Sequence, residues 1–420
     1  MGMDGLAALR QRLFDLVAWF GEDVDRLPAA QAVWRTQSHV VGSGEPWWQR
    51  RVAAGAEDWL GKLERGQLAA APLEPATPAE DALLELEALD LAGSLWPGGA
   101  HGAPAQIFGA GDRARYVVRL GRERQALTAR QPGVLYTHLR FHALVPTQIP
   151  VAANATRYRV DVRPLDRGFT QAIARGIVGV ATTSFKDGAT IEWQAGELGN
   201  RAIALRDGDD RAGRLWGAIK AAALDEVDVL VAPELTVTPG VRDGIVDKLR
   251  WSDDDAPARP LALLVLGSFH EQRGRRFVNC ARLLDGATGN TLLEHHKLVQ
   301  YGVLDGFVEG IQLGDSITVL ATPIGTVAIA ICKDFCDYHV GPIWHHIQPD
   351  WLLVPAYGGG ADAHALASKQ IKNMLGTVVV LAHQGDAALG APFKSFIDDP
   401  LGRTSTDCNA PYIMSRKILI

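Results

Sequence analysis

The chain has 420 residues, of which 47% are hydrophobic and 21% are charged, and these proportions are typical of a soluble globular protein. The length exceeds what one ordinary hydrophobic core organises, so two domains are expected. The net charge of -6 is small for this length and argues against nucleic acid as the main ligand.

The cysteine content and the N-terminus indicate a cytoplasmic protein. Four cysteines in so long a chain, Cys280, Cys332, Cys336 and Cys408, are not a disulfide framework and fit a reducing compartment. The first residues carry acidic side chains, whereas a signal peptide needs a basic start and an apolar core. No apolar run approaches the roughly 20 residues that span a bilayer, so a membrane is not an expected partner.

Residues 1–165 are predicted to form a mainly helical accessory domain. Apolar residues recur at helical spacing over 6–18 and 81–95, and Gly-, Pro- and Ala-rich breaks separate these segments. A loop over 97–104 and a short hairpin over 106–109 and 116–120 follow. The role of this domain stays open among gating a pocket, mediating assembly and recruiting a protein partner.

Residues 170–420 alternate between buried-type strands and helices, which predicts an α/β layer fold. Helices are expected over 207–224 and 362–375, and a hairpin over 277–284 and 291–297. Strands are expected over 176–181, 227–232, 261–267, 327–331, 351–355 and 377–381. The mixture favours two packed sheets with outer helices over a single doubly wound parallel sheet.

Two charged residues follow predicted strands. Glu234 ends the apolar run VLVAPE, where a carboxylate among apolar neighbours suits general-base chemistry; a helix cap or a salt bridge is the alternative. Lys297 ends the run LLEHHK, and a surface lysine is the alternative. Only 10 of the 42 basic residues are lysines, so a lysine at a strand end is less expected by chance.

Cys332 ends a third predicted strand, in the run VAIAICKDFCD. A thiol at an abrupt turn out of a buried strand is placed as a nucleophile, although most free cysteines are structural. With Glu234 as base, the thiol could attack a carbonyl or nitrile carbon. Lys297 and the backbone N–H of Lys333 would then stabilise the tetrahedral intermediate.

The order Glu234, Lys297, Cys332 resembles the nitrilase superfamily, the carbon–nitrogen hydrolases. The motifs VLVAPEL, FVNCARLLDGATG, AIAICKDF, DWLLVPAYGGG, GTVVVLAHQGD and SFIDDPLGR carry the resemblance over about residues 175–405. The resemblance implies an αββα sandwich, a homo-oligomer and no cofactor. It further implies a small-molecule amide, N-carbamoyl or N-acyl substrate, hydrolysed through a cysteine thioester.

The resemblance also predicts auxiliary residues. The stretch KLVQYGVLDGF resembles the aliphatic-amidase pattern, which assigns a second carboxylate to Asp305, with Glu309 as the runner-up. Lys333, Tyr301 and Tyr357 are expected to line the pocket because of their neighbourhood. No metal ion is expected.

Three alternatives remain at this stage. The same triad could serve an acyltransferase or a glutaminase, or the fold could be a non-catalytic interaction scaffold with its site unused. A zinc site is the third. Its candidate ligands are Cys332, Cys336, His339, His345 and His346, but structural zinc sites usually use two closely spaced ligand pairs.

Overall fold

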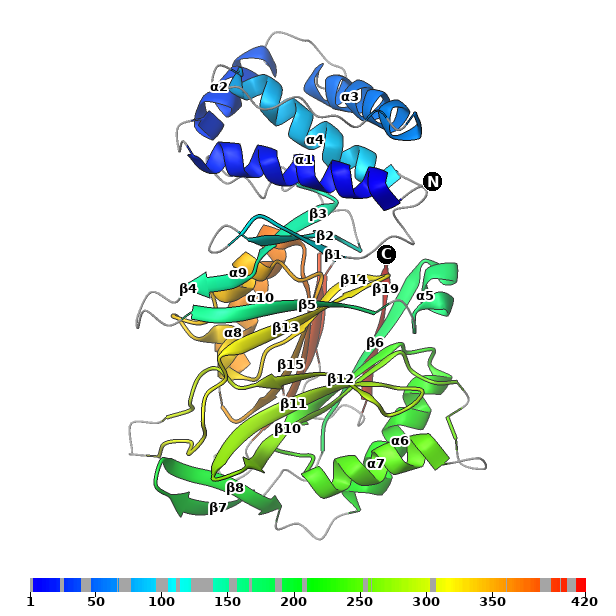
Figure 1. Ribbon diagram of the computed structural model, residues 1–420. Coiled ribbons are helices and arrows are strands. Elements are labelled where there is room, and N and C mark those ends of the chain that lie inside the picture. Colours follow the sequence, from blue (N-terminus) through cyan, green and yellow to red (C-terminus); the bar gives the residue numbers. More distant parts are fainter. Residues whose placement is uncertain are drawn as a thin grey trace. The chain divides into compact units, whose positions relative to one another are not determined.

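The chain forms two compact units, Met1–Thr147 and Gln148–Ile420, in the computed structural model (Figure 1). The structure describes residues 3–22, 26–38, 47–65, 67, 77–95, 105–110, 114–121, 139–150, 157–165, 168–185, 191–205, 210–251, 256–257, 259–302, 307–359, 361–385, 394–400, 402–405 and 413–420. None of the helices in these ranges is long and apolar enough to cross a membrane. The loop predicted over 97–104 lies outside them.

The first unit combines four helices with a small antiparallel sheet. Its elements are α1 (Met3–Glu22), α2 (Arg26–Ser38), α3 (Trp47–Glu64), α4 (Ala79–Leu95), β1 (Ala105–Phe108), β2 (Arg115–Arg119) and β3 (His142–Pro146). Leucines at helical spacing, such as Leu9, Leu13 and Leu16 of α1, are fully buried in its core. On α4, the Asp90 carboxylate accepts hydrogen bonds from backbone N–H groups just before β3, which joins helix to sheet.

The second unit is an αββα sandwich, as the sequence predicted. One sheet has the strand order β12-β11-β10-β9-β6-β19 and the other β18-β17-β16-β15-β14-β13-β5-β4. Strands β9 and β6 of the first sheet face β15, β16 and β17 of the second. Apolar residues of α6 and α7, including Leu215, Ile219 and Ile245, pack with β9 and β10 on the outer face of the first sheet. Helix α10 contacts β16 and β17 of the other sheet.

Where the sequence predicted a run, the element found there begins within four residues of it, although the strand predicted over 261–267 continues to Arg273. The other elements of this unit had no predicted run. The strands are β4 (Gln148–Pro150), β5 (Arg157–Pro164), β6 (Ile177–Thr183), β7 (Ile191–Gly196), β8 (Gly199–Leu205), β9 (Val229–Glu234), β10 (Leu263–Arg273), β11 (Arg276–Asp285), β12 (Thr291–His296), β13 (Ser316–Thr322), β14 (Gly325–Ile329), β15 (Trp351–Tyr357), β16 (Val378–Gln384), β17 (Phe396–Asp399), β18 (Gly402–Ser405) and β19 (Ile413–Leu419). The helices are α5 (Thr170–Arg175), α6 (Arg211–Leu224), α7 (Pro239–Trp251), α8 (Lys333–Cys336), α9 (Ile343–Ile347) and α10 (Ala361–Leu375).

The division between the units falls at Thr147/Gln148, not near residue 165. The reason is a long-range pairing: β5 runs parallel to β13, with Arg159 opposite Ser316, and β4 pairs with β5. Both strands therefore belong to the eight-stranded sheet. The first unit also holds a three-stranded sheet beside its helices.

Candidate active site

Cys332 occupies a strained turn between β14 and helix α8. Its backbone has φ 47° and ψ -106°, in a region that residues other than glycine rarely adopt and that is concentrated at functional sites. The Cys332 N–H donates to the carbonyl of Pro355 at 2.8 Å, and the thiol lies 3.7 Å from the Tyr357 carbonyl. Both carbonyls belong to β15, the parallel neighbour of β14, so this strand holds the cysteine in place.

Glu234 is the last residue of β9 and is only 2% exposed. The chain leaves the strand through Leu235, whose φ is 56° and whose N–H donates to the Ser268 carbonyl at 2.7 Å. Opposite this point β10 bulges at Gly267, which has φ 68°. A Cβ on Gly267 would clash with the carbonyl oxygen of Pro233, so glycine is required beside Glu234.

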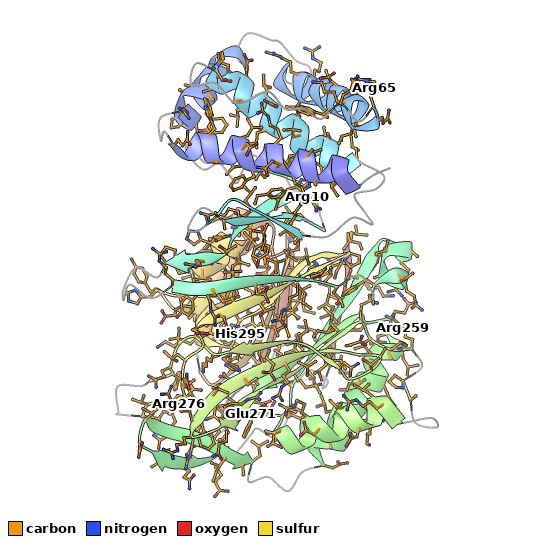
Figure 2. The ribbon with its side chains drawn as sticks, viewed as in Figure 1. Arg10, Arg65, Arg259, Glu271, Arg276 and His295 are labelled. Atoms are coloured by element: carbon orange, nitrogen blue, oxygen red, sulfur yellow. The ribbon has the colours of Figure 1, made fainter. Side chains whose placement is uncertain are left out.

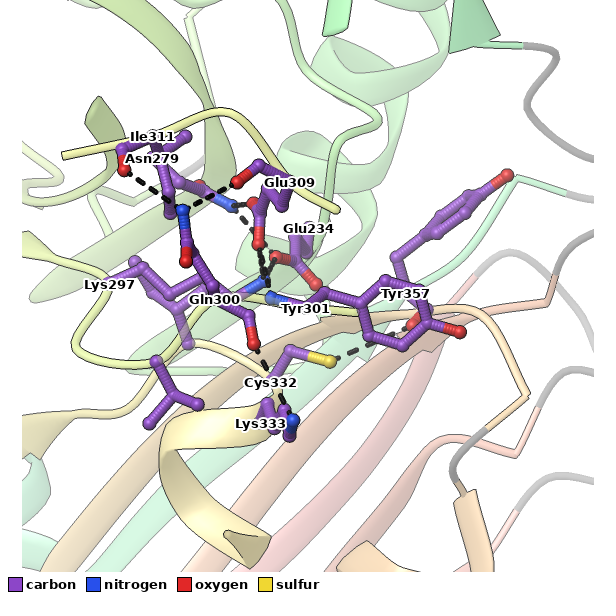
Figure 3. Close-up of polar contacts among 12 residues, drawn as sticks. Glu234, Asn279, Lys297, Gln300, Tyr301, Glu309, Ile311, Cys332, Lys333 and Tyr357 are labelled. Carbon is purple, nitrogen blue, oxygen red and sulfur yellow. Dashed lines mark hydrogen bonds and ion pairs between the residues drawn. The ribbon is translucent and has the colours of Figure 1, made fainter. Parts of the chain in front are cut away.

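Lys297 lies between two carboxylates. Its Nζ donates to Glu234 Oε1 at 2.8 Å and to Glu309 Oε2 at 2.9 Å, and all three side chains are about 2% exposed (Figure 3). Burial by itself would lower the pKa of Lys297, but the two carboxylates outweigh it and raise that pKa well above the ordinary value. Lys297 is therefore a permanent cation inside the sandwich.

Two further side chains also donate to the carboxylates. Asn279 Nδ2 lies 2.8 Å from Glu234 Oε1 and 3.0 Å from Glu309 Oε1. His270 Nε2 lies 2.8 Å from Glu309 Oε1. Burial would raise the pKa of Glu309, but the Lys297 ammonium and the hydrogen bond from His270 hold it well below the usual range. The structure thus stabilises Glu309 as an anion.

Cys332 is a thiol in this environment, not a free thiolate. Burial raises its pKa first, and the neighbouring Glu234 carboxylate raises it further, while Lys297 and the Tyr357 carbonyl contact oppose the shift. To act as a nucleophile, this thiol would have to lose its proton during attack. Glu234 is the carboxylate that interacts with it, so it is placed to receive that proton.

Asp334 connects the turn at Cys332 with the segment after Lys297. Its Oδ1 accepts from the N–H groups of Leu298 and Val299 at 2.8 and 2.9 Å, and its Oδ2 accepts from Ile331 N–H at 3.2 Å. His295 of β12, labelled within the sandwich in Figure 2, places its Nε2 3.2 Å from the same Oδ2. Asp334 is fully buried, so one carboxylate fixes both segments.

The predicted auxiliary residues have different outcomes. Asp305 lies outside the described residues, whereas the runner-up Glu309 contacts Lys297. Tyr301 N–H donates to Glu309 Oε2 at 3.0 Å, and Tyr357 contributes its backbone carbonyl to Cys332. Lys333 has its Nζ 3.5 Å from the Gln300 carbonyl and 3.9 Å from Asp337, at the partly exposed side of the turn.

Sequence reasoning did not single out Asn279 or His270. Asn279 lies in the motif FVNC beside Cys280, and adjacent residues of a strand point to opposite faces. This alternation was the available signal: it turns Asn279 to the face of the strand opposite Cys280. A buried asparagine on that face needs hydrogen-bond partners, and the carboxylates beside Lys297 supply them. His270 is in SFHEQ, three residues after Gly267 of the bulge, where no motif marks it.

Cys280, Glu294 and His296 form the one group within the described ranges with metal-ligand chemistry, each offering an atom within 4.8 Å of the others. It lies on the face of β11 opposite Asn279 and does not include the zinc candidates of the Cys332–His346 segment. Glu294 is already bonded to Arg282 and Arg273 at 2.6 and 3.0 Å. Burial raises the pKa of Cys280 to about 12, which disfavours the thiolate.

These observations define a class of protein: an αββα sandwich that holds a buried Glu–Lys–Glu cluster beside a strained cysteine. No protein-family model and no curated protein matches the chain. Its fold is similar to solved members of the nitrilase superfamily over about 58% of the chain. Saccharomyces cerevisiae Nit3, a member of branch 10 of that superfamily, is 15% identical, with a TM-score of 0.42 over 57% of this chain and 89% of Nit3.

An amidase from Nesterenkonia sp. is also similar. It is 17% identical with a TM-score of 0.41, over 58% of this chain and 90% of the amidase. A cysteine-to-alanine variant of the Nesterenkonia sp. AN1 amidase in complex with butyramide is 18% identical with a TM-score of 0.41, over 58% and 92%. Likenesses of this size say nothing about activity, so the roles proposed below rest on the geometry of this chain.

Proposed function

We propose that this chain is a hydrolase of non-peptide carbon–nitrogen bonds that acts on small amides or on N-carbamoyl or N-acyl compounds. The observation that supports this most is the convergence of Glu234, Lys297 and Cys332, from three strand ends, in a buried site with the cysteine in a strained turn. A buried salt bridge alone is common in stable proteins, but a strained thiol coupled to it is not needed for stability.

In the proposed reaction, the Cys332 sulfur bonds to the carbonyl carbon as its proton moves to Glu234. The carbonyl oxygen becomes an oxyanion, for which the Lys297 ammonium and the Lys333 N–H are the donors. Glu234 then gives its proton to the departing nitrogen, and the C–N bond breaks to leave a thioester. Water, deprotonated by Glu234, hydrolyses the thioester and the proton returns to Cys332.

Glu309 has a different proposed role because its carboxylate is already engaged by four donors, one of which is the Tyr301 N–H. Lys297, His270 and Asn279 hold it as an anion, so it is poorly suited to exchange protons. We assign it to orienting Lys297 and the substrate nitrogen. This assignment takes the runner-up of the sequence pattern in place of Asp305, and a variant pair described in the Discussion separates the two.

Intact-protein mass spectrometry tests the proposal. The protein is mixed with a panel of amides, N-carbamoyl compounds, nitriles and glutamine, quenched in acid and examined for an acyl adduct. An adduct is expected on Cys332, absent in Cys332→Ala and unchanged in Cys336→Ser, which removes the partly exposed thiol one helical turn away. Turnover by Cys332→Ala at the wild-type rate would contradict the mechanism.

The alternative functions, an acyltransferase, a glutaminase or a non-catalytic scaffold, give different outcomes in the same experiment. Transfer of the acyl group to an added amine faster than to water makes the protein an acyltransferase. An adduct from glutamine with release of ammonia makes it a glutaminase. No adduct with any probe, together with equal, slow alkylation of all four thiols, supports an interaction scaffold.

A further inference from the structure

We infer that His270 is a positioning residue for Glu309, and that the hairpin β7–β8 holds His270 in the tautomer this requires. The inference rests on the proposed function for its catalytic consequence, but its structural part stands on separate contacts. Neither His270 nor the hairpin supplies a group that touches the reacting atoms.

The tautomer follows from the two hydrogen bonds of the ring. Ala202 N–H of β8 donates to His270 Nδ1 at 2.8 Å, so Nδ1 is an acceptor and carries no proton. The ring proton is therefore on Nε2, which faces Glu309 Oε1 at 2.8 Å and donates to it. The His270 side chain is completely buried, so no solvent competes for either nitrogen.

The hairpin also fixes the backbone on both sides of Glu309. Asn200 N–H donates to the Val308 carbonyl at 2.7 Å, and Gly310 N–H donates to the Asn200 carbonyl at 2.6 Å. At Gly199, φ is 128° and a Cβ would clash with the Val308 carbonyl. Glycine is therefore what allows the two backbones to approach so closely.

Aromatic contacts complete the link. Trp193 of β7 packs edge-on against the His270 ring, with centroids 5.9 Å apart, and against Phe307, with centroids 4.9 Å apart. The same hairpin thus reaches the carboxylate through His270, the backbone through Asn200, and Phe307, two residues before Glu309, through Trp193. The hairpin therefore contacts the histidine that binds Glu309 and the residues on both sides of Glu309, which is more than a passive surface hairpin requires.

By holding Glu309, His270 also fixes the position of the Lys297 ammonium. Glu309 shares the Lys297 ammonium with Glu234, so a Glu309 carboxylate free to rotate would let the ammonium move away from the position of the developing oxyanion. Removing the partners that orient metal-ligating side chains typically changes activity by about 10–100-fold, and we use the same scale for this orienting contact. We expect this size of effect for His270.

The test uses the full chain and two kinds of measurement. In histidine-selective ¹⁵N NMR, the ring-nitrogen shifts of His270, assigned by their absence in His270→Gln, are expected to show the Nε2–H tautomer. They should move in Glu309→Ala, which removes the acceptor. An Nδ1–H tautomer, or shifts unchanged in Glu309→Ala, overturns the inference whatever the activity is.

The second measurement is turnover of an amide that acylates Cys332. His270→Phe, which keeps ring size without either nitrogen, is expected to lower kcat about 10–100-fold, and His270→Gln, which restores a donor toward Glu309, is expected to recover most of it. Gly199→Ala should resemble His270→Phe, whereas Gly217→Ala in α6, where a Cβ meets nothing within 4 Å, should not. Equal kcat for His270→Phe and wild type, or no recovery with Gln in a folded protein, overturns the positioning role.

The two measurements also separate the inference from the proposed function. If no amide acylates the wild-type protein while the NMR result is as expected, the proposed function fails and the hydrogen-bond chain from Ala202 to Glu309 stands. If acylation occurs and the NMR result is contrary, only the inference fails.

Discussion

Asp334 and Leu298 are joined by a 2.8 Å hydrogen bond from the Leu298 N–H to Asp334 Oδ1. Leu298 follows Lys297, and Asp334 lies two residues after Cys332, so this bond connects the segments that carry the proposed cation and nucleophile. The carboxylate is fully buried and accepts four hydrogen bonds in all. Its removal would leave several backbone donors without partners in the interior.

Asp334→Ala is therefore expected to lower the free energy of unfolding by about 3 kcal/mol and to abolish turnover. Asp334→Asn, which keeps one acceptor oxygen, should lose roughly half as much stability. Chemical denaturation measures both. The control is Asp362→Asn, because Asp362 is 92% exposed in its ion pair with Lys394; a change there as large as that of Asp334→Ala would argue against the connecting role.

The second prediction concerns the bulge beside Glu234. Gly267 and Gly274 have nearly equal φ values, 68° and 63°, but a Cβ on Gly267 would clash with the Pro233 carbonyl and one on Gly274 would meet nothing within 4 Å. Gly274→Ala should cost about 1 kcal/mol of stability, the cost of a positive φ alone. Gly267→Ala should cost roughly 2 kcal/mol more and lower kcat, since the clash displaces Glu234. Similar values for both variants would show that the close approach does not matter.

Asn279→Asp tests the need for a neutral donor between the two carboxylates. A third carboxylate there would repel Glu234 and Glu309, so we expect the free energy of unfolding at pH 8 to fall by about 3 kcal/mol. The new carboxyl would bind a proton more readily in the folded state, so part of the loss should be recovered at pH 5, where it donates again. Asn290→Asp, in the exposed turn after β11, is the matched control and should be near neutral.

Glu309→Gln and Asp305→Asn form the pair that decides the second carboxylate. Because Glu309 contacts Lys297 directly, its amide variant is expected to lower kcat by about 10²-fold or more, and Asp305→Asn by much less. Steady-state kinetics on the same amide measures both. The reverse order would return the role to Asp305, as the sequence pattern assigned it.

Because His383 is buried, we expect the free energy of unfolding to fall in mild acid. Burial lowers its pKa to about 4, and the nearby His364 contributes. A histidine with a lowered folded pKa stabilises the fold above about pH 6.5, and this contribution is lost as the pH falls toward 4, because the unfolded chain binds the proton first. At pH 5 the loss from this group is about 2 kcal/mol.

Replacing His383 by Asn removes this titration and keeps an acceptor near the Lys394 N–H. The stability difference between wild type and His383→Asn is therefore expected to be smaller at pH 5 than at pH 7, by about 2 kcal/mol. Denaturation curves at the two pH values measure it. An equal difference at both would mean that His383 does not control the acid response.

Local sequence patterns were enough to predict the sandwich and the strand ends. Glu234 and Cys332 each follow an apolar run, and a buried strand that turns polar abruptly marks its own end, whereas Lys297 closes a strand of mixed polarity, LLEHHK. The nearness of the three ends could be expected only from the resemblance, because the runs do not show which strands pair. The structure supplies that pairing, with β9 beside β10 and β14 beside β15.

Long-range contacts account for what sequence reasoning did not reach. The unit boundary depends on Arg159 pairing with Ser316, and the choice of Glu309 depends on a bridge between Asn200 and Glu309. Counting eight residues from Lys297 selects Asp305, but loop spacing does not fix which carboxylate points inward. The turn at Cys332, with its positive φ, is likewise held partly from β15, through the Pro355 carbonyl, and this contact is not visible in the residues next to the cysteine.

The assignment of β4 and β5 to the second unit has a consequence for recombination. An exchange of the first unit, by gene fusion or in the laboratory, has to cross over between β3 and β4. A junction near residue 165 would remove the parallel partner of β13 and expose its backbone N–H and C=O groups as a bare sheet edge. Such a chimaera would keep Glu234, Lys297 and Cys332 and still be lost to strand-mediated aggregation.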